Sequence, residues 1–438
     1  MNAKRVFESL KNRGITEAEY RTGSSSSFSI EILNGKLKNY SSNLSSSVTY
    51  DAKINNKLAV INTENLTNKN LNQMNDYLFD IAKYTNKEGA FVFKGGTKYK
   101  KFNYYNKDLI NISNQDKIDM LFKLEKKIRD FDPRIDKVEI GYEETLRKYE
   151  YQNTYGVKLK SKSCGFNISA QIVSKDGKDL RSYYHTFVDN DFSKINLDEY
   201  TKDSSTAAIE KLNPITVKTG KYDVVFSPEV VNILLEAYAS QLNAELVLKN
   251  LSWFKDKINT QVANKKITIF ETPLKRDRFF TNADDQGVPT RNMTLIKKGV
   301  LLTYLHNLDT AYKFNVESNG HASLNGSKMG ISAHAALYLK PGRLTKEEIL
   351  KKVNNGVYIN DLDGLHAGMN PQNGNFSLKC EGLLIENGKL TKALSMISIT
   401  SNLFDIFNNV KLISKNIEYI KHGVFAPCMY LKKVAISS

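Results

Sequence analysis

Most of the residues that could act chemically in this chain lie in three glycine-rich loops. The longest, residues 364–377, reads GLHAGMNPQNGNFS and is bounded by apolar runs. Gly and Asn-Gly pairs allow positive φ angles and a close approach of the backbone, so such a polar loop is often placed for recognition. Its composition is equally typical of an ordinary pair of hairpins, which carry no chemistry. The candidate contact residues in this loop are Gly364, His366, Asn370, Gly374 and Ser377.

Two further loops carry carboxylate or imidazole groups. Residues 284–291 read DDQGVPTR, and residues 318–322 read SNGHA. Two adjacent aspartates could bind a cation or form an acid/base pair, but in a Gly-Pro loop they are more often turn and capping groups. The histidines at 321 and 366 could meet at a cleft, although each alone is more often a hydrogen-bonded structural residue. The candidates in these loops are Asp284, Asp285, Gly287, Arg291, Asn319, Gly320 and His321.

The histidines and cysteines lack the spacing of known metal or nucleophile motifs. No two of the six histidines lie within 12 residues of each other, so none pair on one helix face. Three scattered cysteines are too few for a disulfide framework or a cysteine-based zinc site. Ser377 has no Gly-x-Ser-x-Gly elbow and Cys380 no evident histidine partner. We therefore predict no catalytic residue, no metal ligand and no cofactor bound by this chain.

The composition is that of a soluble globular protein. The chain has 438 residues, of which 41% are hydrophobic, and a mean hydropathy of −0.43. No apolar run could span a membrane, and the start MNAKRVFESLKNRG is not a signal peptide, so we expect a cytoplasmic protein. The net charge of +16 invites nucleic-acid binding, but the lysines are spread through every segment and no nucleic-acid-binding motif stands out. We therefore regard nucleic acid as an unlikely partner.

The first half of the chain predicts helices and hairpins from local signals. Apolar periodicity indicates helices at about residues 3–12, 71–84 and 198–212, and Ser113 with Asp116 caps another before Pro133. Hairpins are predicted where Asn34-Gly35, Asn55-Asn56 and Asp176-Gly177 join alternating runs.

The second half predicts a strand at residues 222–226, followed by a helix that begins at Ser227-Pro228. Further strands are expected at 266–270, 295–304, 333–339 and 429–436. A capping box of Thr345 and Glu348 predicts a helix to residue 353, and another helix is expected at 403–410. Runs of strands interrupted by a few helices indicate an α+β fold with largely antiparallel sheets. We expect two domains, residues 1–213 and 214–438, which pack on each other because the linker is short.

The motifs together resemble the TldD/PmbA family. The resemblance rests on residues 364–377, on the G-x-x-I-E-N-G at 382–388, on the loops at 284–291 and 318–322, and on YDVV at 222–225 and PG at 341–342. The blocks occur in the family's order and spacing and cover most of the chain. The likeness is strongest after residue 222 and weaker before it, where NTYG at 153–156 still matches.

One branch of that family carries a helical zinc-protease motif, His-Glu-x-x-x-His, in which two imidazoles hold zinc and the glutamate activates water. Aligned without gaps from Ser252, this chain has Leu235 and Ser240 where the histidines would be, and keeps the glutamate as Glu236. Without the metal, Glu236 is more simply read as a solvated or salt-bridged helix residue than as a catalytic base. Where the family pattern commonly has a glutamate, this chain has Gln286, which makes a metal role for that loop less plausible.

The resemblance therefore implies the PmbA branch, also called TldE, whose members lack the zinc motif. By that resemblance the chain is a substrate-positioning subunit of a cytoplasmic heterodimeric zinc metalloprotease that trims unfolded peptides, and the zinc lies in a TldD-type partner. The three loops would line the peptide cleft and the partner interface, and an exposed strand edge would suit an extended peptide. Alternatives are a homodimeric peptide- or ligand-binding protein without protease activity, a modulator of DNA gyrase, and an independent peptidase.

Overall fold

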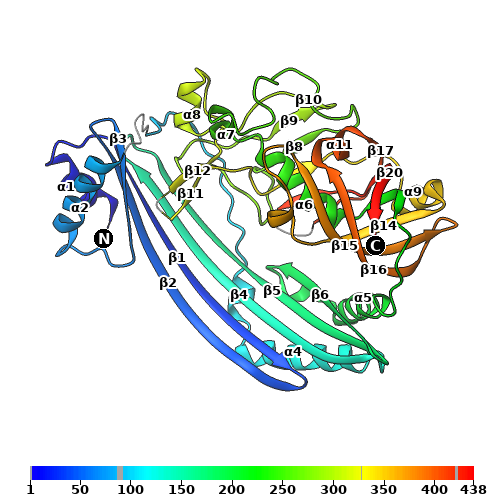
Figure 1. Cartoon of the computed structure of the whole chain (residues 1–438). Coiled ribbons are helices and arrows are strands. Elements are labelled where there is room, and N and C mark those ends of the chain that lie inside the picture. Colours follow the sequence, from blue (N-terminus) through cyan, green and yellow to red (C-terminus); the bar gives the residue numbers. More distant parts are fainter. Residues whose placement is uncertain (1, 86–91, 327, 420–422) are drawn as a thin grey trace. The chain divides into compact units, whose positions relative to one another are not determined.

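The fold is α+β with largely antiparallel sheets, as predicted (Figure 1). It is known from a computed structural model that describes every residue except 1, 86–91, 327 and 420–422. The described chain divides into two compact units. Unit 1 holds residues 1–212, 276–289 and 324–330, and unit 2 holds residues 213–275, 290–323 and 331–438. The single boundary expected at residue 213 leaves out the two later segments that return to unit 1.

Unit 1 is built on a long, curved antiparallel sheet with the strand order β3-β2-β1-β4-β5-β6 (Figure 1). The hairpin turns predicted at Asn34-Gly35, Asn55-Asn56 and Asp176-Gly177 all form, because asparagine and glycine accept the positive φ angles found there. The strands are β1 Ala18–Leu33, β2 Lys36–Ile54, β3 Lys57–Thr63, β4 Ile135–Asn153, β5 Lys158–Asp176 and β6 Asp179–Asp189.

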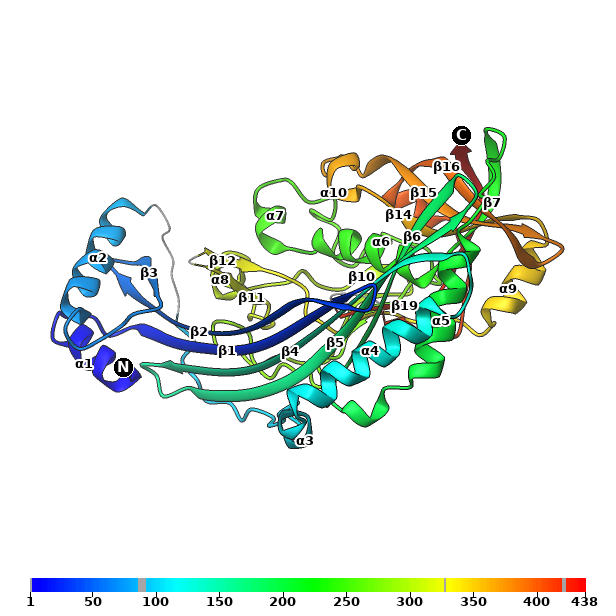
Figure 2. The same ribbon diagram turned by 90° about the horizontal axis from the view of Figure 1, so that it is seen from below.

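Two groups of helices bury separate hydrophobic clusters of unit 1. Helices α1 (Ala3–Lys11) and α2 (Leu71–Tyr84) cover the end of the sheet near β3. Helices α4 (Asn114–Arg129) and α5 (Leu197–Glu210) pack on β4, β5 and β6, and α4 runs along the sheet (Figure 2). Ser113 caps α4 by accepting the amide of Asp116, as predicted. The short α3 (Lys107–Asn111) and the 3-10 turn Phe192–Lys194 complete this unit.

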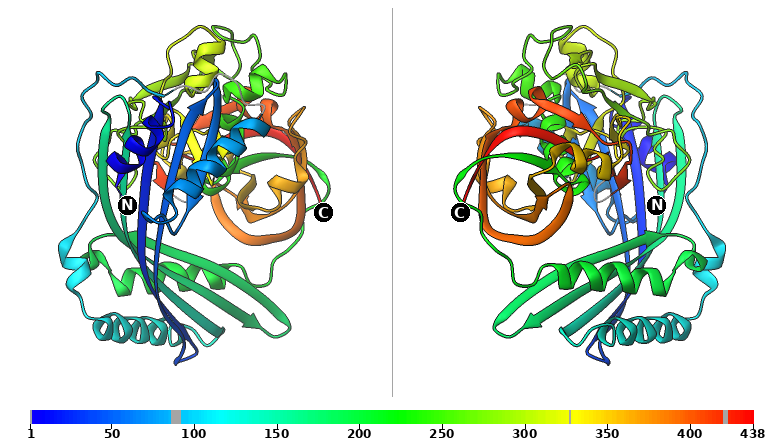
Figure 3. Two further views of the ribbon diagram at one scale, coloured as in Figure 1. Left: turned by 90° about the vertical axis from the view of Figure 1, so that its left-hand side faces the viewer. Right: turned by 90° about the vertical axis from the view of Figure 1, so that its right-hand side faces the viewer.

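Unit 2 contains a sheet that closes on itself. Its order is β16-β15-β14-β7-β20-β17, and β16 also pairs with β20, so five of the strands form a ring (Figure 3). Strand β20 uses one edge twice, pairing first with β17 and then with β16. The strands are β7 Gly220–Phe226, β14 Gly356–Leu362, β15 Asn375–Glu386, β16 Lys389–Asn402, β17 Val410–Ile413 and β20 Met429–Ser437.

A second sheet in unit 2 has the order β10-β9-β8-β13-β19-β18 and consists of short strands. The single strand predicted at 295–304 is instead a tight hairpin, because Lys298 and Gly299 adopt positive φ angles between β9 and β10. The strands predicted at 266–270 and 333–339 shrink to three residues each. The strands are β8 Ile269–Glu271, β9 Met293–Lys297, β10 Val300–Leu301, β13 Leu337–Leu339, β18 Glu418–Tyr419 and β19 Val424–Ala426, and the pair β11 Ala322–Asn325 and β12 Lys328–Ile331 forms a separate ladder.

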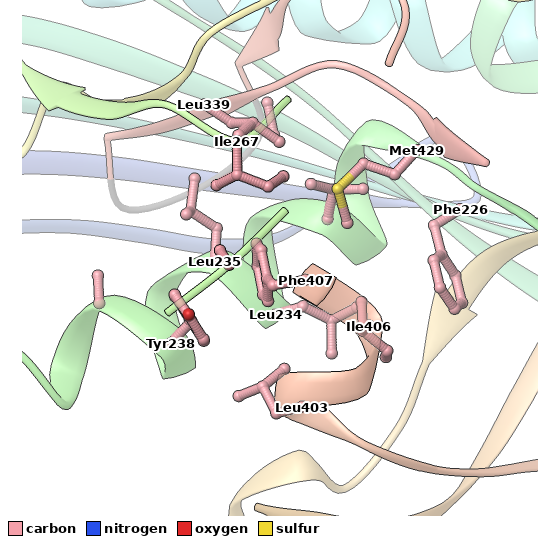
Figure 4. Packing of buried hydrophobic residues seen from close by; sticks show 14 of the residues in the cluster. Phe226, Leu234, Leu235, Tyr238, Ile267, Leu339, Leu403, Ile406, Phe407 and Met429 are labelled. Atoms are coloured by element: carbon pink, nitrogen blue, oxygen red, sulfur yellow. The ribbon is translucent and has the colours of Figure 1, made fainter. Parts of the chain in front are cut away.

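Helix α6 (Pro228–Ser240) is the centre of the hydrophobic core of unit 2. Ser227 caps it and Pro228 occupies its first turn, as the sequence predicts. Figure 4 shows Leu234, Leu235 and Tyr238 of this helix among apolar side chains of both sheets and of α11. The Tyr238 and Phe407 rings stack with their centroids 4.2 Å apart. The other helices are α7 Ala244–Leu248, α8 Leu308–Lys313, α9 Lys346–Val353 with its capping box, α10 Leu365–Gly368 and α11 Leu403–Asn408. Among the described residues, no helix is both long and apolar enough to cross a membrane.

Candidate functional site

The loop that holds Asp284 and Asp285 belongs to unit 1 and is closed by its own side chains. The carboxylate of Asp284 accepts the amides of Gln286 and Val288, each at 2.9 Å, so it caps the turn. Asp285 accepts the amide of Leu324 at 2.7 Å, and burial raises the pKa of its carboxyl group. Both carboxylates are therefore engaged by backbone groups of unit 1.

Three successive carbonyl groups of the same loop are held by side chains of the sheet and its neighbouring segment. Arg21 donates to the Asp285 carbonyl from Nε at 2.9 Å and from Nη2 at 2.7 Å. The Tyr151 hydroxyl donates to the Gln286 carbonyl at 2.9 Å, and the Tyr99 hydroxyl to the Gly287 carbonyl at 2.6 Å. The loop is thus fixed against unit 1 by three donors.

Gly287 cannot be replaced in this position without a shift. Its φ is +75°, and a Cβ built on it would lie 2.6 Å from a ring carbon of Tyr151. Glycine is required here both by the backbone conformation and by the close approach of the tyrosine ring.

Arg21 also neutralises two buried carboxylates beneath the loop. Its Nη1 lies 2.7 Å from Asp51, and its Nη2 forms an ion pair with Glu19. Burial raises the pKa of Glu19 well above its usual value, and Arg21 opposes this effect. We call Glu19, Arg21 and Asp51 the arginine cluster; it is a structural arrangement that sequence reasoning did not anticipate.

The loop around Asn319 lies in unit 2 and is buried. The Oδ1 atom of Asn319 accepts the backbone amide of His306 at 2.7 Å and lies 2.8 Å from Nδ1 of His321, while its amide donates to the Tyr304 carbonyl at 2.7 Å. Gly320 between them has a φ of +79°. Asn319 and His321 are 3% and 1% exposed, so they face the interior of the unit.

His321 meets two residues that are far away in sequence. Its Nε2 lies 2.7 Å from Oε2 of Glu271, whose other oxygen accepts the backbone amide of His334 at 2.8 Å. The His321 and His334 rings are 4.4 Å apart, and one ligand atom of each of the three side chains lies within 4.8 Å of the others. We call Glu271, His321 and His334 the histidine cluster.

Burial and charge set the protonation of this region. Burial alone would raise the pKa of Glu271, but the combined effects of His321 and His334 outweigh burial, so the pKa is lowered. Burial lowers the pKa of His334 to about 4, and does the same for the neighbouring His306. Both of these histidines are therefore neutral at pH 7 and keep a ring nitrogen with a free lone pair, as a metal ligand requires.

Sequence reasoning considered His321 and missed Glu271 and His334. It searched for histidines at helical spacing, whereas these three residues come from the end of β8, from a loop before β11 and from the segment before β13. The pairing of β8 with β13 brings the segments of Glu271 and His334 together, and the Ser332 amide donates to the His321 carbonyl at 3.2 Å. No local pattern encodes either contact.

The glycine-rich loop at 364–377 lines an open cavity of about 980 Å³ in unit 2. Asn370 and Ser377 lie on its wall together with Thr400, Asn402 and Asp405. Asn370 caps its own turn by accepting the amide of Gln372 at 2.8 Å, and the Ser377 hydroxyl lies 3.0 Å from that of Thr400. The cavity wall therefore offers amide and hydroxyl groups and one carboxylate, that of Asp405.

The remaining predicted residues are less informative. Gly364 and Gly374 supply positive φ angles at the two ends of the loop, and Arg291 is exposed in unit 2. The side chain of His366 and the whole of His422 lie outside the part of the chain that the structure describes.

Helix α6 carries the residues that align with the zinc-protease motif. Leu235 is fully buried in the hydrophobic core, Glu236 is exposed, and the Ser240 hydroxyl donates to the Ala237 carbonyl. Burial raises the pKa of the Cys380 thiol to about 12, so this cysteine is not a nucleophile at neutral pH.

Comparison with protein families gives two matches that together cover most of the chain. Residues 219–438 match the PmbA/TldA metallopeptidase C-terminal domain, and residues 107–212 match the PmbA/TldA metallopeptidase central domain.

Individual relatives agree with these matches. A metalloprotease of Methanocaldococcus jannaschii is 24% identical over 92% of this chain and 90% of its own length. The metalloprotease PmbA of Escherichia coli O157:H7 is 25% identical over 70% of this chain and 66% of its own. A zinc metalloprotease TldD homolog of Saccharolobus solfataricus is 23% identical over 70% of both.

Solved structures show the same fold. A proposed modulator of a DNA gyrase from Thermotoga maritima superposes with a TM-score of 0.89 at 27% identity, covering 99% of both chains. TldE from Thermococcus kodakarensis superposes with a TM-score of 0.87 at 18% identity, covering 99% of this chain and 100% of its own.

Proposed function

The chain belongs to the PmbA/TldA metallopeptidase family, and from this premise we propose that it is the PmbA/TldE-type subunit of a heterodimeric zinc metalloprotease. In this proposal a TldD-type partner supplies the zinc and the catalytic residues, and this chain positions an unfolded peptide. The pair acts in the cytoplasm.

The observation that carries the proposal is the composition of α6. A helical zinc site needs two imidazoles that project into a water-filled site. At the aligned positions this helix has Leu235, which is packed in the core, and Ser240, which bonds to its own helix. Glu236 therefore has no helical metal site beside it.

The cavity beside the 364–377 loop supports a role in peptide binding. The backbone of an unfolded peptide offers one donor and one acceptor per residue, and amide and hydroxyl side chains such as Asn370, Ser377 and Thr400 can pair with both. Most of the polar groups on this wall are uncharged, and the carboxylate of Asp405 adds one acceptor for a cationic side chain or a backbone amide of the peptide.

Peptide cleavage in a reconstituted mixture tests the subunit assignment. We expect hydrolysis of an unfolded peptide by the mixture with a TldD-type partner and none by this chain alone. Replacing a zinc-binding histidine of the partner should abolish the activity. Hydrolysis by this chain alone would overturn the assignment.

A blocking substitution tests the cavity. Ser377→Phe places a ring on the cavity wall and is expected to raise the KM of the mixture at least tenfold. The matched control is Thr391→Phe, at an exposed position of β16 outside the cavity, which should leave KM unchanged. Equal effects of the two substitutions would remove the cavity from the proposal.

A second candidate function is modulation of DNA gyrase. It is favoured by the description of the Thermotoga maritima structure and by the net charge of +16, which would attract a phosphate backbone. DNA binding that weakens steeply with salt, together with a change in gyrase supercoiling, would support it. A third candidate, a homodimeric peptide-binding protein, would show a defined dimer mass and peptide binding without any need for a partner.

A further inference from the structure

We propose that Glu271, His321 and His334 form a binding site for one divalent transition-metal ion of the Zn²⁺ class, inside unit 2 and apart from α6. The site lies between β8, the loop at 319–321 and the segment that precedes β13. It differs from the helical zinc motif because none of its ligands lies on a helix.

The distances allow an ion to be held without rearrangement of the backbone. One ligand atom from each side chain lies within 4.8 Å of the other two, and the closest pair, His321 Nε2 and Glu271 Oε2, is 2.7 Å apart. Ligand atoms about 2.0–2.2 Å from a zinc ion lie roughly 3–3.5 Å from one another in a tetrahedral site. Small side-chain rotations span the difference.

Each ligand is already oriented by a second group. Asn319 Oδ1 lies 2.8 Å from Nδ1 of His321 and orients the ring so that Nε2 faces Glu271. The second oxygen of Glu271 accepts the His334 backbone amide at 2.8 Å. A hydrogen bond with the backbone of Gly320 fixes the ring of His334. Histidine and carboxylate ligands of metal sites have such outer partners, which set the tautomer and the ring orientation.

An ion pair between Glu271 and His321 alone would not explain why the ring of His334 is buried beside them with an unpaired nitrogen. Its Nε2 atom is shielded from solvent and has no hydrogen-bond partner among the described residues. A buried polar atom without a partner is uncommon and costs free energy, unless an ion or a water molecule completes it. The His334 side chain supplies one of the three ligand atoms that approach each other, and an ion bound at its Nε2 would satisfy this nitrogen.

The donor set selects the kind of ion. Two imidazoles and one carboxylate suit Zn²⁺, Fe²⁺, Co²⁺ or Ni²⁺, whereas Ca²⁺ and Mg²⁺ prefer oxygen ligands alone. No cysteine takes part, so a soft ion such as Cu⁺ is disfavoured. Three protein ligands leave a fourth position that a water molecule can occupy.

Binding exchanges a proton for the ion. The contact between His321 Nε2 and Glu271 Oε2 requires a shared proton, and the ion takes that proton's place while His321 keeps its bond to Asn319. No covalent or redox step is involved. The ion would tie together three segments of unit 2 that approach the cluster from different parts of the sequence.

Calorimetric titration of the full chain tests the site. The protein is treated with a chelator, dialysed and titrated with Zn²⁺, and with Co²⁺ followed by its visible spectrum. We expect one ion per chain and the intense absorption of a four-coordinate Co²⁺ site without a thiolate band. No binding above the level of the double variant described next would overturn the proposal.

Variants assign the ligands. Glu271→Gln and His334→Gln keep the size of each side chain and are expected to weaken zinc binding more than about 100-fold, since loss of an outer partner alone costs 10–100-fold. His185→Gln, in unit 1, is the matched control and should bind as the parent does. Unchanged affinity in the double variant Glu271→Gln/His334→Gln would assign the ion to another place and overturn the proposal.

Circular dichroism of each variant shows whether it is folded. If Glu271→Gln does not fold, His334→Gln alone carries the test, because the His334 ring has an unpartnered nitrogen and loses less on replacement. The test is independent of the proposed subunit role: the same variants, mixed with the TldD-type partner, separate loss of this ion from loss of peptide cleavage.

Discussion

The two units each bury a cluster of charged side chains, and the clusters are completed in different ways. In unit 1, Arg21 donates to Glu19, to Asp51 and to a loop carbonyl, so every acceptor faces a cation that belongs to the chain. In unit 2, Glu271 instead faces the imidazole of His321, and the nearby His334 is neutral with a ring nitrogen that has no partner among the described residues. The same burial therefore produces one cluster that is complete and one that can still accept a cation.

The difference comes from the chemistry of the two cationic side chains. A guanidinium keeps its charge at all accessible pH values and has five donors, so it can satisfy several buried acceptors at once. An imidazole has two nitrogens and exchanges its proton for a metal ion. An arginine cluster is thus complete as soon as the chain folds. The charge of a histidine cluster instead depends on the protons and metal ions available in solution.

Removing the cation of the complete cluster should have the largest effect. Arg21→Met leaves the carboxylates of Glu19 and Asp51 buried without their cation, and we expect a loss of about 3–5 kcal/mol in the free energy of unfolding. Denaturant unfolding followed by circular dichroism measures it. Arg13→Met is the matched control, since Arg13 forms a more exposed pair with Asp76 and should cost less than about 1 kcal/mol. Similar losses in both variants would contradict the comparison.

Adding zinc should stabilise the folded protein only through the histidine cluster of unit 2. At a zinc concentration of 100 times Kd the parent should gain about 2.7 kcal/mol. Arg21→Met should show the same gain from its lower starting point, and His334→Gln should gain less than about 0.4 kcal/mol because it binds zinc more than about 100-fold more weakly. Thermal unfolding with and without zinc measures all three, and an equal gain in His334→Gln would refute the prediction.

Removal of a single neutral hydrogen bond to the 284–291 loop should lower the free energy of unfolding by a smaller amount. Tyr99→Phe removes only the donor to the Gly287 carbonyl, and we expect a loss of about 1 kcal/mol. Tyr40→Phe, whose hydroxyl accepts a bond from Asn114 at an exposed place, should change the free energy of unfolding by a few tenths of a kcal/mol. A larger loss of stability in Tyr40→Phe than in Tyr99→Phe would show that the hydrogen bond to the Gly287 carbonyl does not explain the effect of Tyr99→Phe.

The smallest effect should come from His185, a half-buried histidine outside both clusters. Burial lowers its pKa, Asp203 opposes this, and the rings of Tyr183 and Tyr200 lie against it. Because the folded state then binds its proton less readily than the unfolded state, stability falls as the pH drops below about 6.5. His185→Gln should lose less stability than the parent between pH 7 and pH 5.5. Parallel curves for the two proteins would contradict this.

Local signals allowed most elements of the fold to be predicted. The cap at Ser113, the capping box at Thr345 and the turn at Asn34-Gly35 each depend on residues within a few positions of one another, and all three form. The lengths of β1 and β2 could not be foreseen. The serine runs at 24–27 and 45–47 lack an apolar alternation, yet they pair with each other across the two strands.

The candidate site was harder to predict because its parts are not local. The sequence pointed to the loop around His321 and to the 364–377 loop, which lines a cavity. It gave no sign of Glu271 and His334, since strand pairing brings these two together and a separate loop contact brings them to His321. Asp284 and Asp285 illustrate the opposite case, where a chemically suggestive pair is occupied by turn amides and backbone bonds.

The discontinuity of unit 1 affects how the protein is made. The carbonyl acceptors of Arg21 and Tyr151 lie 264 and 135 residues further along the chain. A ribosome therefore synthesises both long hairpins of unit 1 well before the loop that completes them. During that interval the arginine cluster lacks one of its acceptors, so unit 1 reaches its final stability only after part of unit 2 has been translated. Early termination near residue 213 would leave Nε of Arg21 without its carbonyl acceptor, although the ion pairs with Glu19 and Asp51 could form.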